Sequence, residues 1–380
     1  MLAIGIMSGT SLDGIDVCVI EIKKNIKYEY SIKAFTSFPY KEEIVKKIKE
    51  VSNLETSNVQ KICSLNVEIS YEYVDAINKC LSLYNIKISD IEYIAMHGQT
   101  IWHNPDNMDG FVSSTLQIGD PSVIAYEFNK KVISNFRMMD MAAGGCGAPL
   151  IPFVDYLLYS SKDKNIVMQN IGGIGNVCYM KKDATIDDII AFDTGPGNMM
   201  IDEATMILFN KPFDETGNIA KSGKINKDVL NELLNDEYLK RPYPKSTGRE
   251  KYNTEFVKNV INKIMNNGGK KEDVISTLTA FTAYSIIDAY DNFLSDIDQI
   301  IVSGGGSHND YMMDILKEKY HEKVVIENRT DAFEAFGFAI LGHMTMLNLP
   351  SNVPAVTNAS RQVVLGNITN PPYNNDLRGK

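Results

Sequence analysis

Along the chain, short continuous runs of apolar residues alternate with segments in which apolar residues recur at helical spacing. Leu2–Met7 and Ile15–Ile22 are apolar runs of strand length, and over Tyr28–Phe38 aromatic and β-branched residues alternate with polar ones. These patterns predict a β-hairpin followed by a third strand. In Lys41–Leu83 apolar residues recur at helical spacing among charged ones, which predicts helices. A strand, a helix and a strand complete this part of the chain, at Ile91–Met96, Pro121–Asn129 and Lys131–Asn135.

The same order of patterns starts again near residue 166. A second hairpin is predicted over 166–180, and its return strand Gly175–Cys178 resembles Gly14–Cys18 of the first hairpin. The later elements that the pattern predicts are a strand at Ile189–Phe192, a largely helical region over 199–294, strands at Gln299–Val302 and Val324–Ile326, and a helix at Ala332–Leu347.

We therefore predict an α/β fold in which one architecture is used twice, although the identity between the halves is too weak to establish a duplication. A length of 380 residues suits two domains. We expect domains at 1–140 and 141–380, with the boundary within 137–165 and a hinge in the glycine-rich Ala142–Ala148. The second domain carries a helical insertion, and we leave open that its C-terminal end packs back on the first domain.

Composition narrows the class of protein. The chain has 38 basic and 48 acidic residues, a net charge of −10, which argues against nucleic acid and against an anionic membrane surface as partners. Its five scattered cysteines form no Cys-x-x-Cys, so we expect neither a disulfide framework nor a zinc site, and a cytoplasmic location fits. We read no signal peptide and no membrane span. The sequence leaves a homodimer open.

The turn of the first hairpin is the strongest candidate for a phosphate site. Closely spaced backbone N–H groups can hold phosphate oxygens, Thr10 and Ser11 add hydroxyl donors, and Asp13 or Asp16 could hold Mg²⁺. A hairpin that merely needs glycine is the alternative, but a two-residue turn would satisfy that need. The loop is neither a Walker A nor a Rossmann motif. Its residues are Gly9, Thr10, Ser11, Leu12, Asp13, Gly14, Ile15 and Asp16.

Two later turns have the same character. A γ-phosphate held between two domains needs donors from both sides, so the second hairpin turn gains weight from the first. Three glycines in succession after the strand at Gln299–Val302 let a ligand approach the backbone closely, and an ordinary strand-to-helix turn is the alternative. The nucleotide-binding candidates in these turns are Asn170, Gly172, Gly173, Gly304, Gly305 and Gly306.

Asp193 is the candidate catalytic base. It stands at the carboxyl end of the strand predicted at Ile189–Phe192, where a carboxylate can orient and deprotonate a hydroxyl or a water in phosphoryl transfer. The alternative is an aspartate that caps the next helix. Gly195-Pro196-Gly197 separates Asp193 from that helix, which makes simple capping less natural.

A polar segment with one aromatic residue, around His97, Thr100 and Trp102, predicts a sugar-binding edge. A structural histidine is an equal alternative, and two histidines without a third ligand make a poor metal site. Arg137, which we expect at the end of a strand, could bind a substrate carboxylate, or it could form a surface pair with Asp140. The basic loop Pro244–Glu250 is most simply a solvated turn.

Taken in order along the chain, these segments resemble the anhydro-N-acetylmuramic acid kinase family, within the sugar kinase, Hsp70 and actin superfamily. No single segment decides the resemblance, but the ordered set spans nearly the whole chain. The segments are Met7–Asp16, His97–Thr100, Thr115–Asp120, Gly144–Pro149, Asn170–Ile174, Phe192–Asn198, Pro244–Glu250 and Gly304–Gly306.

The resemblance implies two ribonuclease H-like domains that flank an ATP cleft. It also implies an ATP- and Mg²⁺-dependent enzyme that opens 1,6-anhydro-N-acetylmuramic acid and phosphorylates O6, giving N-acetylmuramic acid 6-phosphate in cell-wall sugar recycling. By that likeness Asp193 activates a water, the Gly9–Asp16 loop binds ATP phosphates, and His97, Thr100 and Arg137 contact the sugar. The chain departs from the family pattern at Asn135, Cys146, Gly337 and Asn358.

Two other functions remain open at this stage. An ordinary hexose or N-acetyl amino-sugar kinase of the same superfamily would use the aspartate on a sugar hydroxyl and consume no water. An actin- or Hsp70-like ATPase would bind a polymer or a client protein, but the chain has no appended client domain and carries His97, Trp102 and Arg137 for a small molecule.

Overall fold

The computed structural model describes residues 1–12, 14–107, 110–248, 250–327 and 330–373. Contacts between Cα atoms divide the chain into two compact units. Unit 1 consists of Met1–Val154 and Ala332–Lys380, and unit 2 of Asp155–Asp331. The chain therefore leaves unit 1 within helix α5 (Ile151–Tyr159) and returns to it just before helix α13 (Phe333–Met346).

Unit 1 is built on a six-stranded mixed sheet in the order β13-β7-β4-β1-β2-β3. The first three strands form an antiparallel meander, and β4 and β7 continue the sheet in parallel with β1. Residues of β1 are buried over most of its length, as expected of a strand with a layer on each face. The strands are β1 (Leu2–Met7), β2 (Ile15–Lys24), β3 (Tyr28–Phe38), β4 (Ile91–Met96), β7 (Lys131–Ser134) and β13 (Asn367–Thr369).

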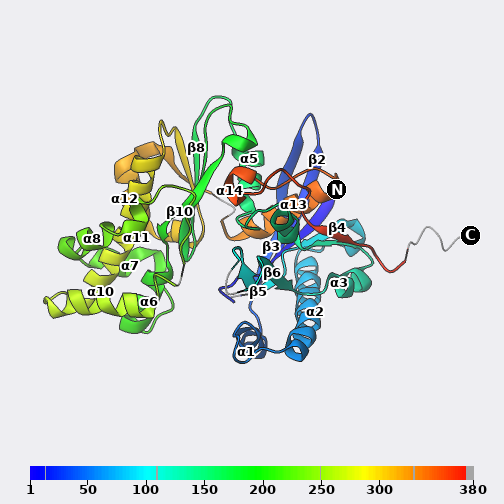
Figure 1. The fold of residues 1–380 in the computed structure, drawn as a ribbon, viewed down its shortest axis with the longest axis horizontal. Coiled ribbons are helices and arrows are strands. Elements are labelled where there is room, and N and C mark those ends of the chain that lie inside the picture. Colours follow the sequence, from blue (N-terminus) through cyan, green and yellow to red (C-terminus); the bar gives the residue numbers. More distant parts are fainter. Residues whose placement is uncertain (13, 108–109, 249, 328–329, 374–380) are drawn as a thin grey trace, which may run out of the picture. The chain divides into compact units, whose positions relative to one another are not determined.

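Helices cover both faces of this sheet (Figure 1). On one face, α2 (Val59–Leu83) buries Ile69, Tyr73 and Ile77 in a core with the strands. The other face is covered by α13, which contacts β1, β2 and β4. The remaining elements of the unit are α1 (Glu42–Val51), α3 (Pro121–Phe128), α4 (Phe136–Ala142), α14 (Pro354–Thr357), a 3-10 turn at Ile88–Asp90 and a separate hairpin of β5 (Gln99–Asn104) with β6 (Ser114–Ile118).

Two glycines allow α13 to lie directly on the sheet. A Cβ on Gly5 of β1 would stand 1.9 Å from the Ala335 carbonyl oxygen, which is shorter than any real contact. On the helix, a Cβ on Gly342 would stand 2.6 Å from the Cβ of Ala95 in β4. Since backbone meets backbone here, the small residues set the distance between helix and sheet.

Unit 2 repeats the topology of unit 1. Its five-stranded sheet has the order β10-β9-β8-β11-β12, in which the first three strands are antiparallel and β11 and β12 run parallel to β8. The first hairpin, the third strand and two parallel strands therefore occupy equivalent places in both sheets. The strands are β8 (Ile166–Ile171), β9 (Ile174–Met180), β10 (Ile190–Pro196), β11 (Gln299–Ser303) and β12 (Val324–Ile326).

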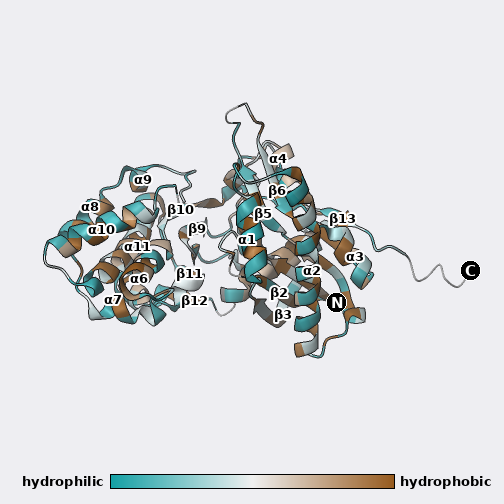
Figure 2. Cartoon of the chain, turned by 90° about the horizontal axis from the view of Figure 1, so that it is seen from below, coloured by the Kyte–Doolittle hydropathy of each residue, from teal (hydrophilic) through white to brown (hydrophobic). Residues whose placement is uncertain are grey.

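The helices between β10 and β12 gather around α11 (Lys271–Phe293) (Figure 1), and their buried residues form one core with those of the sheet. Helices α8 (Lys227–Leu234) and α10 (Thr254–Asn266) are amphipathic, with hydrophobic and hydrophilic sides visible in Figure 2. The other helices are α6 (Met199–Phe209), α7 (Asn218–Ser222), α9 (Glu237–Lys240) and α12 (Asp310–Tyr320), with 3-10 turns at Ile186–Asp188, Glu215–Gly217, Gly305–His308, His321–Lys323 and Thr330–Ala332. Within the described ranges, no helix is long and apolar enough to cross a membrane.

The structure corrects several details of the predicted elements. Arg137 and Asp140 do not end a strand, because β7 stops at Ser134 and both residues lie on α4. Asn135 bridges the two elements in the left-handed conformation, with φ 57°. Strand β10 extends beyond Phe192 to Pro196. Apart from these corrections, unit 1 includes Ala332–Lys380, a segment that the predicted limits placed in 141–380 while leaving open that it packs back on the first domain.

Substitution of Gly5 by alanine is expected to destabilise unit 1. The added Cβ cannot fit against the Ala335 carbonyl, so α13 must move from the sheet at a cost of about 3 kcal/mol. Urea unfolding followed by circular dichroism measures the effect. Gly9→Ala is the matched control, since its Cβ would meet Ser11 Oγ at an ordinary 3.4 Å. Equal unfolding midpoints for Gly5→Ala and Gly9→Ala would contradict the packing argument.

Candidate functional site

The segment Gly9–Asp16 comprises the turn between β1 and β2 and the first two residues of β2, and it is tied to the β5 hairpin. The Leu12 N–H donates to the Gly9 carbonyl at 3.3 Å, with Leu12 in the left-handed region at φ 61°. Gln99 Nε2 of β5 donates to the same carbonyl at 3.2 Å, and Tyr40 donates to Gln99 Oε1 at 3.2 Å. The buried Gln99 side chain therefore fixes where this turn begins.

The residues of this loop have different settings. Thr10 and Ser11 are exposed and can offer hydroxyl groups to a ligand. Gly14 is glycine for packing, because a Cβ there would stand 2.4 Å from the Phe38 carbonyl oxygen. Ile15 is 2% exposed in the core, and Asp16, half-buried, pairs in register with Met7 on β1. Asp13 lies outside the described residues.

A chain of hydrogen bonds connects His97 to the C-terminal segment of unit 1. Arg137 Nε donates to His97 Nε2 at 3.0 Å, and Arg137 Nη1 donates to the Gly147 carbonyl at 2.9 Å.

The chain continues at Asp140. The Gly147 N–H donates to Asp140 Oδ2 at 2.8 Å. Asn352 Nδ2 and Thr357 Oγ1 donate to Asp140 Oδ1 at 2.7 and 2.8 Å. Asp140 is fully buried, so it is an anchor for the Ala143–Gly147 loop and not a surface partner of Arg137.

The bonds of His97 define its tautomer. Nε2 accepts from Arg137, so the proton is on Nδ1, which donates to the Gly98 carbonyl at 2.7 Å. Burial, with the neighbouring Arg137 cation, lowers the pKa of His97 to about 3, so the ring is neutral. Burial also lowers the pKa of Arg137 to about 10, which leaves the guanidinium charged at neutral pH. This arrangement orients a cation and does not form a proton relay.

Thr100 and Trp102 lie on β5. Thr100 Oγ1 accepts a hydrogen bond from Gln117 Nε2 of β6 at 3.3 Å, and Trp102 is 40% exposed. Both belong to unit 1, as do His97 and Arg137. The predicted sugar-binding residues therefore share a unit, and His97 and Arg137 are in direct contact.

In unit 2, three turns meet at the ends of parallel strands β8 and β11. The carbonyls of Gly172 and Gly173 accept from the N–H groups of Asn198 and Gly197 at 2.8 and 2.9 Å. Asn198 Nδ2 donates to the Ile171 carbonyl at 3.3 Å. The structure thus joins the second hairpin turn to the start of α6, and Asn198 is a member of the cluster that we did not predict.

The Gly304–Gly306 turn packs on the same hairpin. Gly304 has φ 81°, and a Cβ on it would stand 2.5 Å from Asn170 Oδ1. A Cβ on Gly306 would stand 2.3 Å from the Ile171 side chain. The nucleotide-binding candidates of unit 2 are therefore adjacent, and Gly304 and Gly306 are required by the packing of the turns on one another.

Asp193 lies inside β10 at an irregularity of the strand. The register with β9 shifts between Asp193 and Gly195, and Gly195 has φ 144°. Bulges of this kind redirect a side chain from the regular pleat. Helix α6 begins only at Met199, with Asn198 at its N-cap, so Asp193 does not cap that helix.

The Pro244–Glu250 loop, described except for Arg249, is bonded to Asp193 and is not merely a solvated turn. The Asp193 N–H donates to the Lys245 carbonyl at 3.1 Å, and the Thr247 N–H donates to Asp193 Oδ2 at 3.0 Å. Tyr238 of α9 donates its hydroxyl to the Asp193 carbonyl at 2.9 Å. The only hint of this contact in the sequence is the basic, hydroxyl-rich composition of the loop. The spacing of apolar residues gives no information about it, because the loop has no helical or strand pattern.

Burial raises the pKa of Asp193 to about 6, with the Glu250 carboxylate in support and the Thr247 N–H and Lys245 in opposition. A carboxylate with this pKa is ionised at neutral pH and is a stronger base than an exposed aspartate. Its setting suits proton removal from a water or a hydroxyl.

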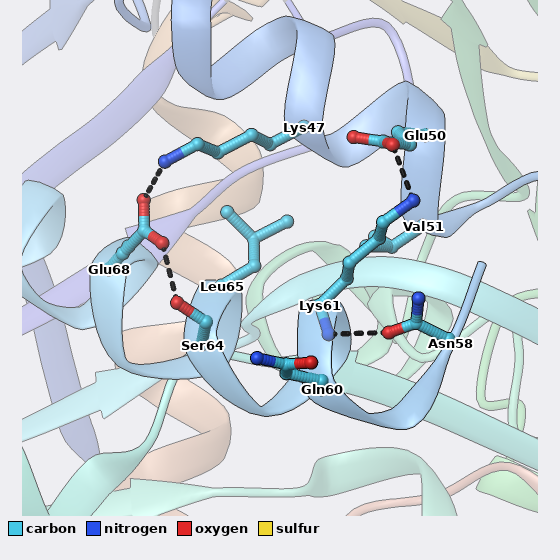
Figure 3. Close-up of a pocket in the computed structure, with 9 residues that line it drawn as sticks. All are labelled: Lys47, Glu50, Val51, Asn58, Gln60, Lys61, Ser64, Leu65 and Glu68. Atoms are coloured by element: carbon cyan, nitrogen blue, oxygen red, sulfur yellow. Dashed lines mark hydrogen bonds and ion pairs between the residues drawn. The ribbon is translucent and has the colours of Figure 1, made fainter. Parts of the chain in front are cut away.

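Among the described residues, no group of three or more His, Cys, Asp or Glu side chains is placed to hold a metal ion. A surface pocket of about 400 Å³ lies between α1 and α2, and none of the candidate site residues lines it (Figure 3). Its charged groups are already paired, Lys47 with Glu68 and Lys61 with Glu50. We assign it no function.

Comparison with known proteins gives a consistent result. The model of the family described as anhydro-N-acetylmuramic acid kinase matches residues 1–371. The chain is 45% identical to the anhydro-N-acetylmuramic acid kinase of Francisella tularensis subsp. novicida (strain U112), over 96% of this chain and 97% of the relative. It is also 45% identical to that of Clostridioides difficile (strain 630), over 98% and 99% of the two chains.

A relative from Bacillus cereus (strain B4264) with the same name is 43% identical over 98% of both chains. Among solved structures, the activator of the 2-hydroxyisocaproyl-CoA dehydratase from Clostridium difficile is similar with a TM-score of 0.48 and 11% identity, over 90% of this chain and 93% of that chain. We rest no argument on a structural similarity this low. The match over nearly the full length and the identity to curated relatives decide the assignment: the chain belongs to the anhydro-N-acetylmuramic acid kinase family.

Proposed function

We propose that this protein is a kinase that uses ATP to convert 1,6-anhydro-N-acetylmuramic acid into N-acetylmuramic acid 6-phosphate and ADP. The observation that carries the proposal is family membership over residues 1–371, with relatives of that name at 45% identity. The half-buried Asp193, with its raised pKa, supports it, because the reaction needs a group that takes a proton from water.

In the proposed reaction Asp193 accepts a proton from a water whose oxygen attacks the anomeric carbon C1. The bond between C1 and O6 breaks, and O6 takes the γ-phosphoryl group from ATP as the bond to ADP breaks. Thr247 contributes by holding Asp193 Oδ2 through its N–H, which leaves Oδ1 for the water. Exclusion of other water would limit wasteful ATP hydrolysis.

For the nucleotide, we propose that the adjacent turns around Asn170, Gly172, Gly173 and Gly304–Gly306 contact ATP in unit 2. The Gly9–Asp16 loop, with the exposed Thr10 and Ser11, is proposed to contact it from unit 1. Magnesium with ATP commonly takes one or two protein carboxylates besides phosphate oxygens, a donor set to which the Asp16 carboxylate is suited. When bound, the ion would neutralise phosphate charge.

For the sugar, we propose that Arg137 binds the lactyl carboxylate and that His97 and Thr100 contribute to the same subsite. His97 cannot be protonated near neutral pH, so its contribution is to hold the Arg137 fork by accepting from Nε. Asp140 also helps to hold the Arg137 guanidinium in place, because it binds the N–H of Gly147, whose carbonyl accepts from Arg137.

We propose that each unit is a ribonuclease H-like domain, supported by the shared order of an antiparallel three-stranded meander followed by two parallel strands. The division into two domains is proposed to follow the two units, with the C-terminal segment in the first. The ATP cleft between the domains, the cytoplasmic location and a homodimer stay predictions.

The activity is tested by offering ATP with 1,6-anhydro-N-acetylmuramic acid, N-acetylmuramic acid or N-acetylglucosamine, and by running the first reaction in ¹⁸O-labelled water. We expect phosphorylation of the anhydro sugar and prompt appearance of the label at C1. Phosphorylation of N-acetylglucosamine in preference to the anhydro sugar, without label, would indicate an ordinary amino-sugar kinase. ATP hydrolysis that no sugar stimulates would indicate an ATPase.

Replacement of Asp193 by asparagine is expected to lower kcat by about 10³-fold or more, because an amide cannot accept the proton. ATP affinity, measured by isothermal titration calorimetry, should stay within about twofold of wild type, since the substitution keeps the size of the side chain. Near wild-type turnover of the anhydro sugar by this variant would remove Asp193 from the mechanism.

The pH dependence of kcat/KM follows from the role of Asp193, because only the ionised carboxylate can accept a proton. With a pKa of about 6, Asp193 becomes protonated as the pH falls, so kcat/KM should fall through pH 6 and drop about tenfold per pH unit below it. A profile of kcat/KM between pH 4.5 and 8 measures this limb. A plateau that continues down to pH 4.5 would show that no group with this pKa is needed.

Arg137→Lys is expected to raise KM for 1,6-anhydro-N-acetylmuramic acid about tenfold, since lysine keeps the charge but loses the two-pronged contact. KM for 1,6-anhydro-N-acetylglucosamine, which lacks the lactyl carboxylate, should change little. The exposed Arg361 of the same unit, replaced by lysine, is the control. Equal effects on both sugars would mean that Arg137 has only a structural role.

A further inference from the structure

Lys245 has an unusual environment for a loop lysine. Its Nζ lies 5.5, 5.0 and 4.7 Å from the ring centroids of Phe192, Tyr238 and Phe293. The same Nζ donates to the carbonyl oxygens of Tyr238 and Leu239 at 3.3 and 2.9 Å. The ammonium is therefore held by aromatic faces and by carbonyls of the last turn of α9, which both favour a cation.

The backbone of the same residue is bonded to the proposed catalytic strand. The Lys245 carbonyl accepts from the Asp193 N–H at 3.1 Å, and two residues later the Thr247 N–H donates to Asp193 Oδ2 at 3.0 Å. One side chain therefore anchors a segment whose backbone contacts both the N–H and the carboxylate of Asp193. The ring of Phe192, which faces the Lys245 ammonium, comes from the residue next to Asp193 in β10.

We propose that Lys245 is a positioning residue, which locks the Lys245–Thr247 segment onto β10 and thereby fixes the orientation of the Asp193 carboxylate. This rests on the proposed function, in which Asp193 is the base. Without the anchor, the Thr247 N–H can leave Oδ2, and the carboxylate can rotate away from the water that it must deprotonate. A displacement of about 1 Å at a reacting group can cost about 10²-fold in rate.

The geometry argues against a direct contact of Lys245 with phosphate. The ammonium already donates to the Tyr238 and Leu239 carbonyls and faces three aromatic rings. Loss of a phosphate contact would raise KM for ATP, whereas loss of positioning lowers kcat at nearly unchanged KM.

Opposite charges also act on Asp193 from this loop. The Glu250 carboxylate supports the raised pKa of Asp193, and the Lys245 ammonium opposes it. Burial lowers the pKa of Lys245 itself to about 8, against the effect of Asp193. Removal of either loop charge should therefore move the acid limb of the rate profile, and the two removals should move it in opposite directions.

The experiment compares kcat, both KM values and the pH profile of kcat/KM for Lys245→Met, Lys245→Arg and Glu250→Gln in the full-length protein. Lys245→Met should lower kcat about tenfold or more and leave both KM values within about twofold. The apparent pKa of the acid limb of its kcat/KM profile should rise by about 0.3 pH units. That of Glu250→Gln should fall by a similar amount, the size expected of a screened charge pair. Lys245→Arg, which keeps the cation, should return the limb to its wild-type position.

Lys240→Met is the matched control, because that exposed lysine of α9 bonds to Asn235 and not to the Asp193 segment. Thermal melts show whether Lys245→Met is folded, and Lys245→Arg keeps the test valid if it is not. A rise of tenfold in KM for ATP, or a wild-type kcat and profile in Lys245→Met, would overturn the proposal. If Asp193→Asn is inactive in that case, only the role of Lys245 fails. An active Asp193→Asn variant would overturn the base assignment and the positioning role together.

Discussion

In each unit the first strand pairs in parallel with a strand from much later in the chain, and the position of the candidate loops in that unit depends on this pairing. β1 pairs with β4 and β8 pairs with β11, so the carboxyl ends of paired strands lie at one edge of each sheet. In unit 1 this places His97 next to Ile6, whose carbonyl accepts the His97 N–H at 3.1 Å. In unit 2 it places Ser303 opposite Asn170. Ligand-binding loops collect at such edges because strand ends there are neighbours without being consecutive.

This constraint explains why so much could be predicted from the sequence. The β-strands are short apolar runs, and their following turns carry the glycine, hydroxyl and carboxylate groups at residues 9–16, 170–173 and 304–306. Once the order of strands repeats, the turns at equivalent strand ends must lie at equivalent edges. Asn358 has φ 62° at the end of α14, a left-handed conformation that glycine adopts most readily and that asparagine tolerates better than most other residues.

What the sequence did not reveal depends on contacts between distant residues. Helix α4 is only seven residues long, and its Asp140 is held by Asn352 and Thr357, more than two hundred residues away. From the sequence alone, Arg137 and Asp140 therefore resemble an ion pair on the surface at the end of a strand. The Pro244–Glu250 loop has no periodicity, and its role depends on bonds to Asp193 that only the folded chain forms. Local pattern cannot report a partner of that kind.

The setting of Asp193 is a balance between opposing effects. Burial raises its pKa from 3.8 to about 6, which destabilises the ionised form by about 3 kcal/mol relative to an exposed aspartate. More burial, or another acidic neighbour, would leave the carboxyl protonated at neutral pH and useless as a base. Less burial would make it a weaker base. The Thr247 N–H and the Lys245 ammonium oppose burial and Glu250, so the loop both holds the carboxylate in place and keeps its pKa below neutrality. Geometry and basicity at Asp193 thus depend on the same short segment, and a change in the loop should alter both together.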